Sequence, residues 1–286
     1  MRCIKYFCQF LFIGILFIFF KIIGLKLSRI VAGKLFLIFG PFFRSRKIIE
    51  NNLSFAFLDL NKNFKENIIK KMWEGYGKIF AEYMFFRYFR ESDTVRFLEV
   101  KGQENLESIK ISKQPVIFIS GHFNNFELMA MHIEKSGIDL AAIYRPLNNY
   151  FLNPLMEKIR TKYICKNQIK KGISGTKEIL KFFKSGTSIA LMIDQRVSEG
   201  IKSSFFKKKA STTTIPAQFV KKFNCKIVPI YIQRKNSEMF ILEIMDPISF
   251  NKNQTTEEIT LKLNQLMENM ILRNPSQWIW SHNRWK

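Results

Sequence analysis

Short apolar runs alternate with amphipathic segments through most of the chain beyond residue 115. The apolar runs cover residues 116–119, 140–144, 188–193, 227–232 and 240–245. Short runs of this kind are typical of strands buried on both faces of a parallel sheet. Helical periodicity predicts helices over residues 125–135, 151–162, 175–184 and 255–272. Strands that alternate with helices predict an α/β fold with a largely parallel central sheet flanked by helices.

The chain begins with a long apolar segment. Residues 6–20 carry no charge, and the apolar stretch extends through Leu25 if Lys21 reaches the membrane surface. Twenty helical residues rise about 30 Å, the thickness of a hydrocarbon core. A cleaved signal peptide is the alternative, but the small-residue cleavage site is missing, so we predict a retained transmembrane helix. More basic residues follow the segment than precede it, which places the bulk of the chain in the cytoplasm.

A second apolar piece, residues 35–43, contains Gly40-Pro41 and is too short to span a membrane. It is expected to lie in the membrane interface or to pack on the domain. We therefore divide the chain into an N-terminal membrane anchor and interfacial segment, residues 1–43, and a second domain, residues 44–286. The part from 44 to 111 reads as helical.

Composition narrows the class of protein. The 286 residues carry a net charge of +23, and a mean hydropathy of −0.06 excludes a polytopic membrane protein. The charge favours an anionic partner: nucleic acid, a membrane face, an acidic protein or a phosphorylated substrate. Enrichment of Lys with Phe, Ile and Asn in an AT-rich genome is the alternative explanation for the positive charge.

The four cysteines form no CxxC pair and lie at no metal-ligand spacing to a histidine, so neither a disulfide framework nor a metal site is predicted.

The first candidate site follows the apolar run that ends at Ile119. His122 falls at the predicted strand-to-helix turn, and Glu127 falls in the first turn of the helix. Because helical side chains lean toward the N-terminus of their helix, Glu127 is expected to accept a hydrogen bond from His122 and leave the other nitrogen as a general base. A purely structural pair is the alternative. No Ser or Cys occupies a nucleophile elbow, so the base would act directly on a substrate hydroxyl or water.

Polar groups also follow two other predicted strands. Arg145 comes after the run 140–144, and Asp194 comes after the run 188–193. Ligands of such sheets bind beyond the carboxyl ends of the strands, so both residues are expected near His122. Arg145 is suited to bind a phosphate or an oxyanion, and Asp194 to orient Arg145 or a substrate group. A buried structural pair of Arg145 and Asp194 is the alternative.

These segments, taken in order, resemble the late acyltransferases of lipid A biosynthesis, the lauroyl/myristoyl group within the lysophospholipid acyltransferase superfamily. The resemblance covers nearly the whole chain and rests on His122-x4-Glu127, Tyr144-Arg145-Pro146-Leu147-Asn148-Asn149, Asp194-Gln195, Phe205-Phe206 leading to Ala210-Ser211-Thr212-Thr213-Thr214, Val228-Pro229 and the segment 277–286. There are departures from the family pattern. Asn124 stands where the family usually has Gly, Phe126 where it has Trp, and Phe206-Lys207 replaces a Phe-Phe-Gly segment.

The resemblance implies acyl transfer from acyl carrier protein to a hydroxyl of a lipid A precursor, with no metal or redox cofactor. It implies His122 as the base, Glu127 as the group that holds its ring, and Arg145, Asp194 and Asn125 as substrate-binding residues. It also implies a bacterial inner-membrane protein with a single transmembrane pass and a cytoplasmic catalytic domain. Acyl carrier protein, the phosphorylated acceptor and the membrane would then be the anionic partners, with Lys207, Lys208 and Lys209 as a docking patch.

Two other functions remain open. A glycerophospholipid or lysophospholipid acyltransferase is the nearer one, although that group typically has Asp at the position of Glu127 and a different block around Arg145. A membrane-tethered nucleic-acid binder is remote, because no binding motif is present and the lysines are scattered. Three of the four Trp lie in the last nine residues, where they form either a belt at the headgroup level or a packed tail.

Overall fold

The computed structural model describes residues 2–57 and 59–286, and within them seven strands form one sheet in the order β1-β9-β8-β2-β5-β3-β4. The five neighbouring strands from β8 to β4 are parallel. Strand β9 pairs antiparallel with β8, and β1 pairs parallel with β9. Strands β6 and β7 form a separate antiparallel hairpin. The bounds are β1 Leu98–Lys101, β2 Ile117–Ser120, β3 Leu140–Tyr144, β4 Asn167–Lys170, β5 Ser188–Met192, β6 Ile201–Phe205, β7 Lys208–Thr212, β8 Ile227–Arg234 and β9 Phe240–Ile244.

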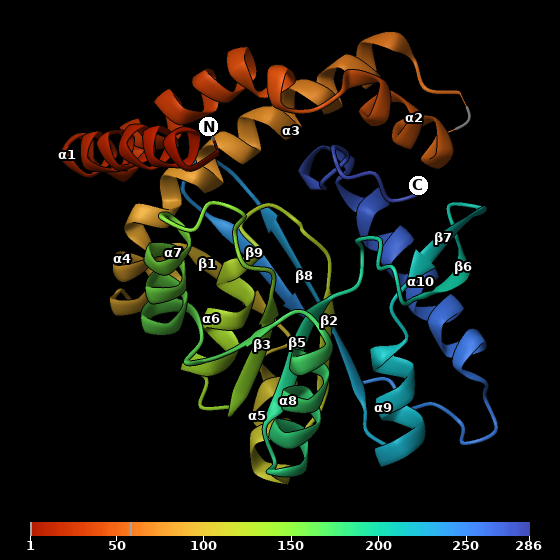
Figure 1. The fold of residues 1–286 in the computed structure, drawn as a ribbon. Coiled ribbons are helices and arrows are strands. Elements are labelled where there is room, and N and C mark those ends of the chain that lie inside the picture. The colour runs from red at the N-terminus through yellow and green to blue at the C-terminus, as the bar shows by residue number, and fades with distance from the viewer. Residues whose placement is uncertain (1, 58) are drawn as a thin grey trace.

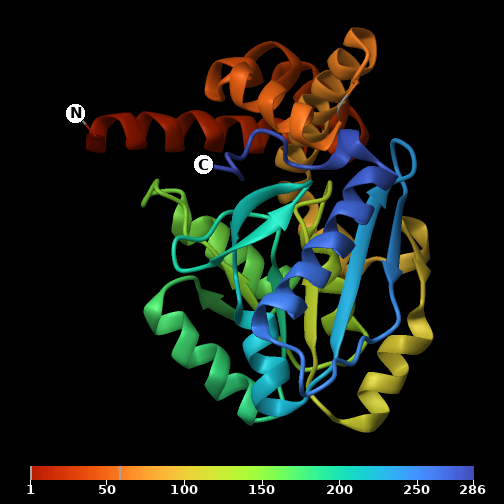
Figure 2. The same cartoon turned by 90° about the vertical axis from the view of Figure 1, so that its right-hand side faces the viewer.

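The helices lie on both sides of this sheet, with α8 on one side and α5 on the other (Figures 1 and 2). Helices α1, α2 and α3 and the C-terminal residues cover one end of the sheet (Figure 1). That end is where the parallel strands finish, because Arg234 at the end of β8 contacts Glu82 of α3. The bounds are α1 Arg2–Phe43, α2 Arg46–Ala56, α3 Lys62–Glu82, α4 Phe86–Glu91, α5 Gln103–Ser112, α6 Glu127–Lys135, α7 Asn153–Ile159, α8 Ile173–Lys184, α9 Ile215–Phe223 and α10 Thr256–Arg273.

The predicted fold class, α/β with a largely parallel central sheet flanked by helices, is confirmed. The five predicted strands are β2, β3, β5, β8 and β9. Strand β2 is buried at all four positions, as its apolar run requires. In the described part of the region 44–111, every element except β1 is a helix, and β1 lies with β4 at the edges of the sheet.

Helix α1 is broken at one residue. Gly24 has φ 77° and ψ 166°, a conformation that essentially only glycine adopts. The Ser28 hydroxyl lies 2.8 Å from the Phe20 carbonyl oxygen and 2.7 Å from that of Gly24, so it partners groups that the break leaves without helical hydrogen bonds. We call residues 2–23 the first segment of α1 and residues 25–43 its second segment.

The second segment lies tightly against α3. A Cβ atom added at Gly77 of α3 would lie 2.1 Å from the Ala32 carbonyl oxygen, so the two backbones touch. Residues 35–43 also pack on α3, because a Cβ atom added at Gly40 would collide with the Trp73 ring and the Phe36 ring lies 5.5 Å from that of Phe80. This confirms packing on the domain for residues 35–43, whereas the division of the chain at residue 43 stays a prediction. By length and apolar composition α1 is able to cross a membrane.

Candidate active site

His122 and Asp194 form the central polar contact at the carboxyl ends of the strands. The His122 Nδ1 atom lies 2.8 Å from Asp194 Oδ1, and the His122 backbone N–H donates to Oδ2 at 2.8 Å. Trp278 Nε1 donates to the same Oδ2 at 2.8 Å. The Asp194 side chain is fully buried, whereas the imidazole is 20% exposed. One face of the pair is therefore fixed in the protein, and the ring edge is accessible.

The sheet explains why these two residues meet. Strands β2 and β5 are parallel neighbours, and Ser120 lies beside Met192 in their register. His122 and Asp194 each follow two residues later, so both emerge at the same height. Gly121 leaves room for the carboxylate, because a Cβ atom there would lie 3.2 Å from Asp194 Oδ2 and 2.9 Å from Met267 Sδ.

The charge of Asp194 determines the tautomer of His122. Burial alone would raise the pKa of Asp194, but the His122 charge and the hydrogen bonds from His122 and Trp278 lower it to about 2. An ionised carboxylate only accepts hydrogen bonds, so the proton of neutral His122 resides on Nδ1. The Nε2 lone pair is then available as a base, with Gln195 Nε2 3.4 Å away.

The expected hydrogen bond from His122 to Glu127 is wrong. The carboxylate of Glu127 faces Arg160, whose Nε and Nη2 atoms lie 2.9 and 2.8 Å from Oε1, and it also accepts a hydrogen bond from the Tyr83 hydroxyl. The imidazole instead contacts the ring of Phe126, the residue before Glu127, with ring centroids 4.8 Å apart. Proximity in sequence therefore did not decide which acid holds the histidine.

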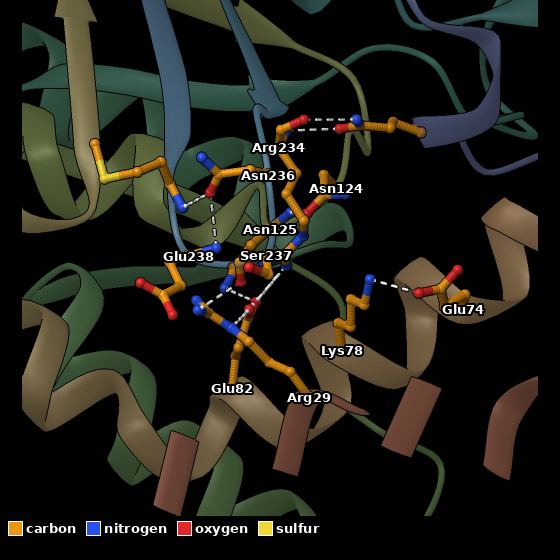
Figure 3. A network of polar contacts seen from close by, with 12 residues as sticks. Arg29, Glu74, Lys78, Glu82, Asn124, Asn125, Arg234, Asn236, Ser237 and Glu238 are labelled. Carbon is orange, nitrogen blue, oxygen red and sulfur yellow. Dashed lines mark hydrogen bonds and ion pairs between the residues drawn. The ribbon is translucent and has the colours of Figure 1, made fainter. Parts of the chain in front are cut away.

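Asn125 is also placed differently from the prediction. Its side chain is fully buried and donates from Nδ2 to Glu82 Oε2 at 2.8 Å. Glu82 accepts from Arg29 Nε at 2.5 Å and from Arg234 Nη2 at 2.8 Å, so all these side chains converge on one carboxylate (Figure 3). The Asn125 side chain is thus bound inside the protein, and through Glu82 it fixes the loop that carries His122 to α1, α3 and β8.

Arg145 and Asp194 do not form a pair. Arg145 is exposed, and Asp194 is occupied by His122 and Trp278, so the expectation that Asp194 orients Arg145 or binds substrate is wrong. The register of β3 and β4 places Tyr144 beside Lys170, so Arg145 lies next to Lys171. Burial lowers the pKa of Lys171, and the charge of Arg145 lowers it further. Two neighbouring cations at this end of the sheet are a suitable place for an anion.

Local sequence patterns did not mark Trp278 or Arg160 as site residues. Trp278 and Trp280 are fully buried, so these two residues belong to a packed tail and not to a belt at the headgroup level. Arg160 lies between the rings of Tyr83 and Tyr144, with its guanidinium carbon 5.9 and 5.6 Å from their centroids. The one signal for Trp278 was its place in a segment of the family resemblance.

Among the described residues, no group of three or more His, Cys, Asp or Glu side chains could hold a metal ion.

Comparison with known proteins identifies relatives along the whole chain. The sequence profile of bacterial lipid A biosynthesis acyltransferases matches residues 1–286. The chain is 24% identical over 293 residues to the lipid A biosynthesis lauroyltransferase of Escherichia coli (strain K12), covering 99% of this chain and 92% of that protein. It is 23% identical to the lipid A biosynthesis palmitoleoyltransferase of the same organism, covering 86% and 80%. A crystal structure of the 1-acyl-sn-glycerophosphate (LPA) acyltransferase from Thermotoga maritima matches with a TM-score of 0.41 and 14% identity, covering 96% of this chain and 99% of that one.

Proposed function

The chain belongs to the bacterial lipid A biosynthesis acyltransferase family, and from this premise we propose that it transfers a fatty acyl chain from acyl carrier protein to a hydroxyl of a lipid A precursor. The observation that carries the mechanism is the contact between His122 Nδ1 and the buried Asp194 carboxylate at 2.8 Å. It leaves Nε2 as a base at an accessible ring edge.

In the proposed reaction, His122 Nε2 takes the proton of the acceptor hydroxyl as its oxygen attacks the thioester carbonyl carbon. The new carbon–oxygen ester bond forms and the carbon–sulfur bond breaks. The imidazolium then returns the proton to the leaving pantetheine thiolate. Asp194 holds the ring in one tautomer and stabilises its positive charge without itself taking the proton.

Glu127 is proposed to act through Arg160 instead of through His122. Its carboxylate accepts a hydrogen bond from Arg160 Nε and forms an ion pair with Nη2 at the start of α6, next to the residue whose ring contacts the imidazole. Arg160 then supplies a fixed positive charge close to the reacting groups. Glu127 is in this sense a positioning residue.

Arg145 is proposed to bind a phosphate of the acceptor together with Lys171. Both cations lie at the ends of neighbouring parallel strands, and Arg145 is exposed. Guanidinium groups bind phosphate oxygens through paired hydrogen bonds. An acceptor phosphate there would also relieve the repulsion between the two cations.

The protein is proposed to act at the bacterial inner membrane, with α1 as its attachment and the catalytic domain on the cytoplasmic side. The basic residues that follow the apolar segment support that orientation. Hydropathy alone predicts a single transmembrane pass, formed by the apolar stretch from residue 6 through Leu25.

Mass spectrometry of lipids tests the function. Lipid A from cells that lack the gene should be missing one acyl chain, and the intact gene should restore it whereas a His122→Ala gene should not. Unchanged lipid A together with altered phospholipid would instead identify a glycerophospholipid acyltransferase. Purified protein supplied with acyl carrier protein or coenzyme A thioesters of the same acid identifies the donor, and equal rates from both would contradict the proposed dependence on acyl carrier protein.

A further inference from the structure

The first segment of α1 contacts the domain near both of its ends. At one end, the ring of Tyr6 lies 5.6 Å from that of Tyr150, and the Phe7 ring lies 5.4 Å from that of Phe151. Asn149, itself buried, donates from Nδ2 to the Tyr6 carbonyl oxygen at 2.9 Å. The loop between β3 and α7 therefore holds the beginning of the helix.

The other end of the segment is held by α3. The rings of Phe17 and Phe20 lie 5.0 and 6.2 Å from the ring of Phe80, and both side chains are buried. Just beyond the break at Gly24, Arg29 forms its buried ion pair with Glu82. The helix is therefore joined to the domain on both sides of the break.

These contacts conflict with a helix that crosses the bilayer. Tyr6 and Phe20 are separated by 14 residues, about 21 Å along a helix, against a hydrocarbon core of about 30 Å. A transmembrane first segment would draw the loop that touches Tyr6 through most of that core. The loop has irregular backbone and includes exposed Arg145 and Asn148, and neither feature is tolerated against lipid.

The face of the first segment that points away from the domain is apolar. Its exposed large side chains are Ile4, Leu11, Phe12, Ile15, Ile18, Phe19 and Ile22. Exposed basic residues lie near both ends of this stripe: Arg2 and Lys5 near its start, and Lys21 and Lys26 near its end. An apolar stripe with basic ends fits an anionic lipid leaflet, because the side chains enter the acyl region while the cations stay at the headgroups.

We propose that the first segment of α1, residues 2–23, lies in the plane of one leaflet and does not cross the membrane. The domain takes the place of the polar face that an interfacial helix normally has. The end of the sheet that carries His122 then faces the leaflet in which a lipid acceptor resides. The inference rests on the proposed membrane attachment and replaces the single transmembrane pass.

Thiol labelling distinguishes the two arrangements. An in-plane helix places Cys3 on the same side of the membrane as the C-terminus, whereas a transmembrane helix places the two on opposite sides. Three full-length variants keep Cys165, whose thiol is buried and has its pKa raised to about 12. The first, Cys8→Ser with Cys225→Ser, retains Cys3. The second adds Cys3→Ser and serves as background, and the third adds Lys286→Cys to that background. Each variant must retain acyl transfer, and each is treated with a membrane-impermeant maleimide in spheroplasts and in inside-out vesicles.

The in-plane helix predicts that Cys3 and Lys286→Cys are both labelled in inside-out vesicles and neither in spheroplasts. Labelling of the two thiols in opposite preparations would overturn the proposal, as would a Cys3 that reacts only after detergent is added. Fractionation separates this result from the proposed function: protein found in the soluble fraction would refute the membrane attachment itself. Unchanged lipid A in the gene-deleted strain would refute the activity and leave a same-side labelling result intact.

Discussion

The imidazole of His122 and the carboxylate of Asp194 form the smallest unit on which the proposed chemistry depends. The Asp194→Asn variant keeps the shape of the side chain and loses its charge, so the ring is no longer fixed in the productive tautomer. We expect kcat to fall by about 10³ to 10⁴-fold with little change in the fold. Single-turnover acyl transfer measures this loss.

Trp278→Phe is the matched control for that variant. It removes one hydrogen bond from Asp194 but keeps the carboxylate charge and the contact with His122. We expect a smaller loss of kcat than in Asp194→Asn. Near-normal turnover of a folded Asp194→Asn protein would assign the orientation of His122 to another group.

Two histidines, the buried His132 and the half-buried His282, should make the folded protein sensitive to acid. Burial lowers the pKa of His132 to about 4 and that of His282 to about 4. Between pH 6.5 and 4 the unfolded chain binds protons at these residues that the folded chain does not. The contribution of these two histidines to the free energy of unfolding is therefore fully present above pH 6.5. It is lost as the pH decreases, by up to about 1.4 kcal/mol per pH unit for each histidine.

The His132→Gln variant tests this sensitivity at one residue. Its Nε2 atom lies 2.9 Å from the Gln103 Oε1 atom, a contact that a glutamine amide can replace. We expect the slope of the free energy of unfolding against pH, measured by urea titration between pH 6 and 5, to decrease by one proton equivalent. An unchanged slope would mean that His132 titrates normally in the folded protein.

Asp194, with its pKa lowered to about 2, contributes stability that is lost only below about pH 4.

At the scale of the elements, the break in α1 separates its two segments. Gly24 has a positive φ, but an added Cβ atom there would meet no atom within 4 Å, so the cost of a side chain is conformational. We expect Gly24→Ala to lower the free energy of unfolding by about 1 to 3 kcal/mol or to straighten the helix. Thermal unfolding in detergent measures the change.

Gly14 provides the matched control, because it also has open space around the added Cβ atom but lies in regular helix. Gly14→Ala should be neutral or stabilising by up to about 1 kcal/mol. Equal effects of the two substitutions would show that the conformation of Gly24 is not required.

The sequence predicted the elements that have strong apolar patterns and missed those that do not. Strands β1 and β4 are edge strands of four residues whose exposed polar positions break the apolar run, so periodicity could not indicate them. The hairpin of β6 and β7 turns through Phe206 and Lys207, both with positive φ, where Asn-Gly would have been the recognisable signal.

The same limit explains the error at the candidate site. The apolar runs correctly placed His122 and Asp194 at strand ends, but they did not give the order in which the strands lie. Strand β5 lies between β2 and β3 in the sheet, and this puts Asp194 beside His122. Arg160 and Trp278 reach the site from a helical turn and from the C-terminal segment, which no local pattern connects to β2.

At the scale of the whole molecule, the hairpin links a cluster of positive charge to the site. Lys207, Lys208 and Lys209 are exposed at its turn. Phe205, in the same hairpin, contacts Trp278 with ring centroids 6.1 Å apart, and Trp278 donates to Asp194. A negatively charged acyl carrier protein docked at these lysines would deliver its thioester close to His122, which gives the cluster a place on the proposed reaction path.

Replacing all three of these lysines by glutamine should weaken donor docking without changing the chemistry. Lys177, Lys181 and Lys184 of α8 are also exposed, and their replacement by glutamine removes the same charge from another part of the surface. We expect the hairpin variant to raise the KM for acyl carrier protein thioester and to reduce its dependence on salt, since long-range attraction between charges is screened by ions. The α8 variant should change neither quantity. If the two variants respond alike, the net charge of +23 acts as a diffuse field and the hairpin is not the docking surface.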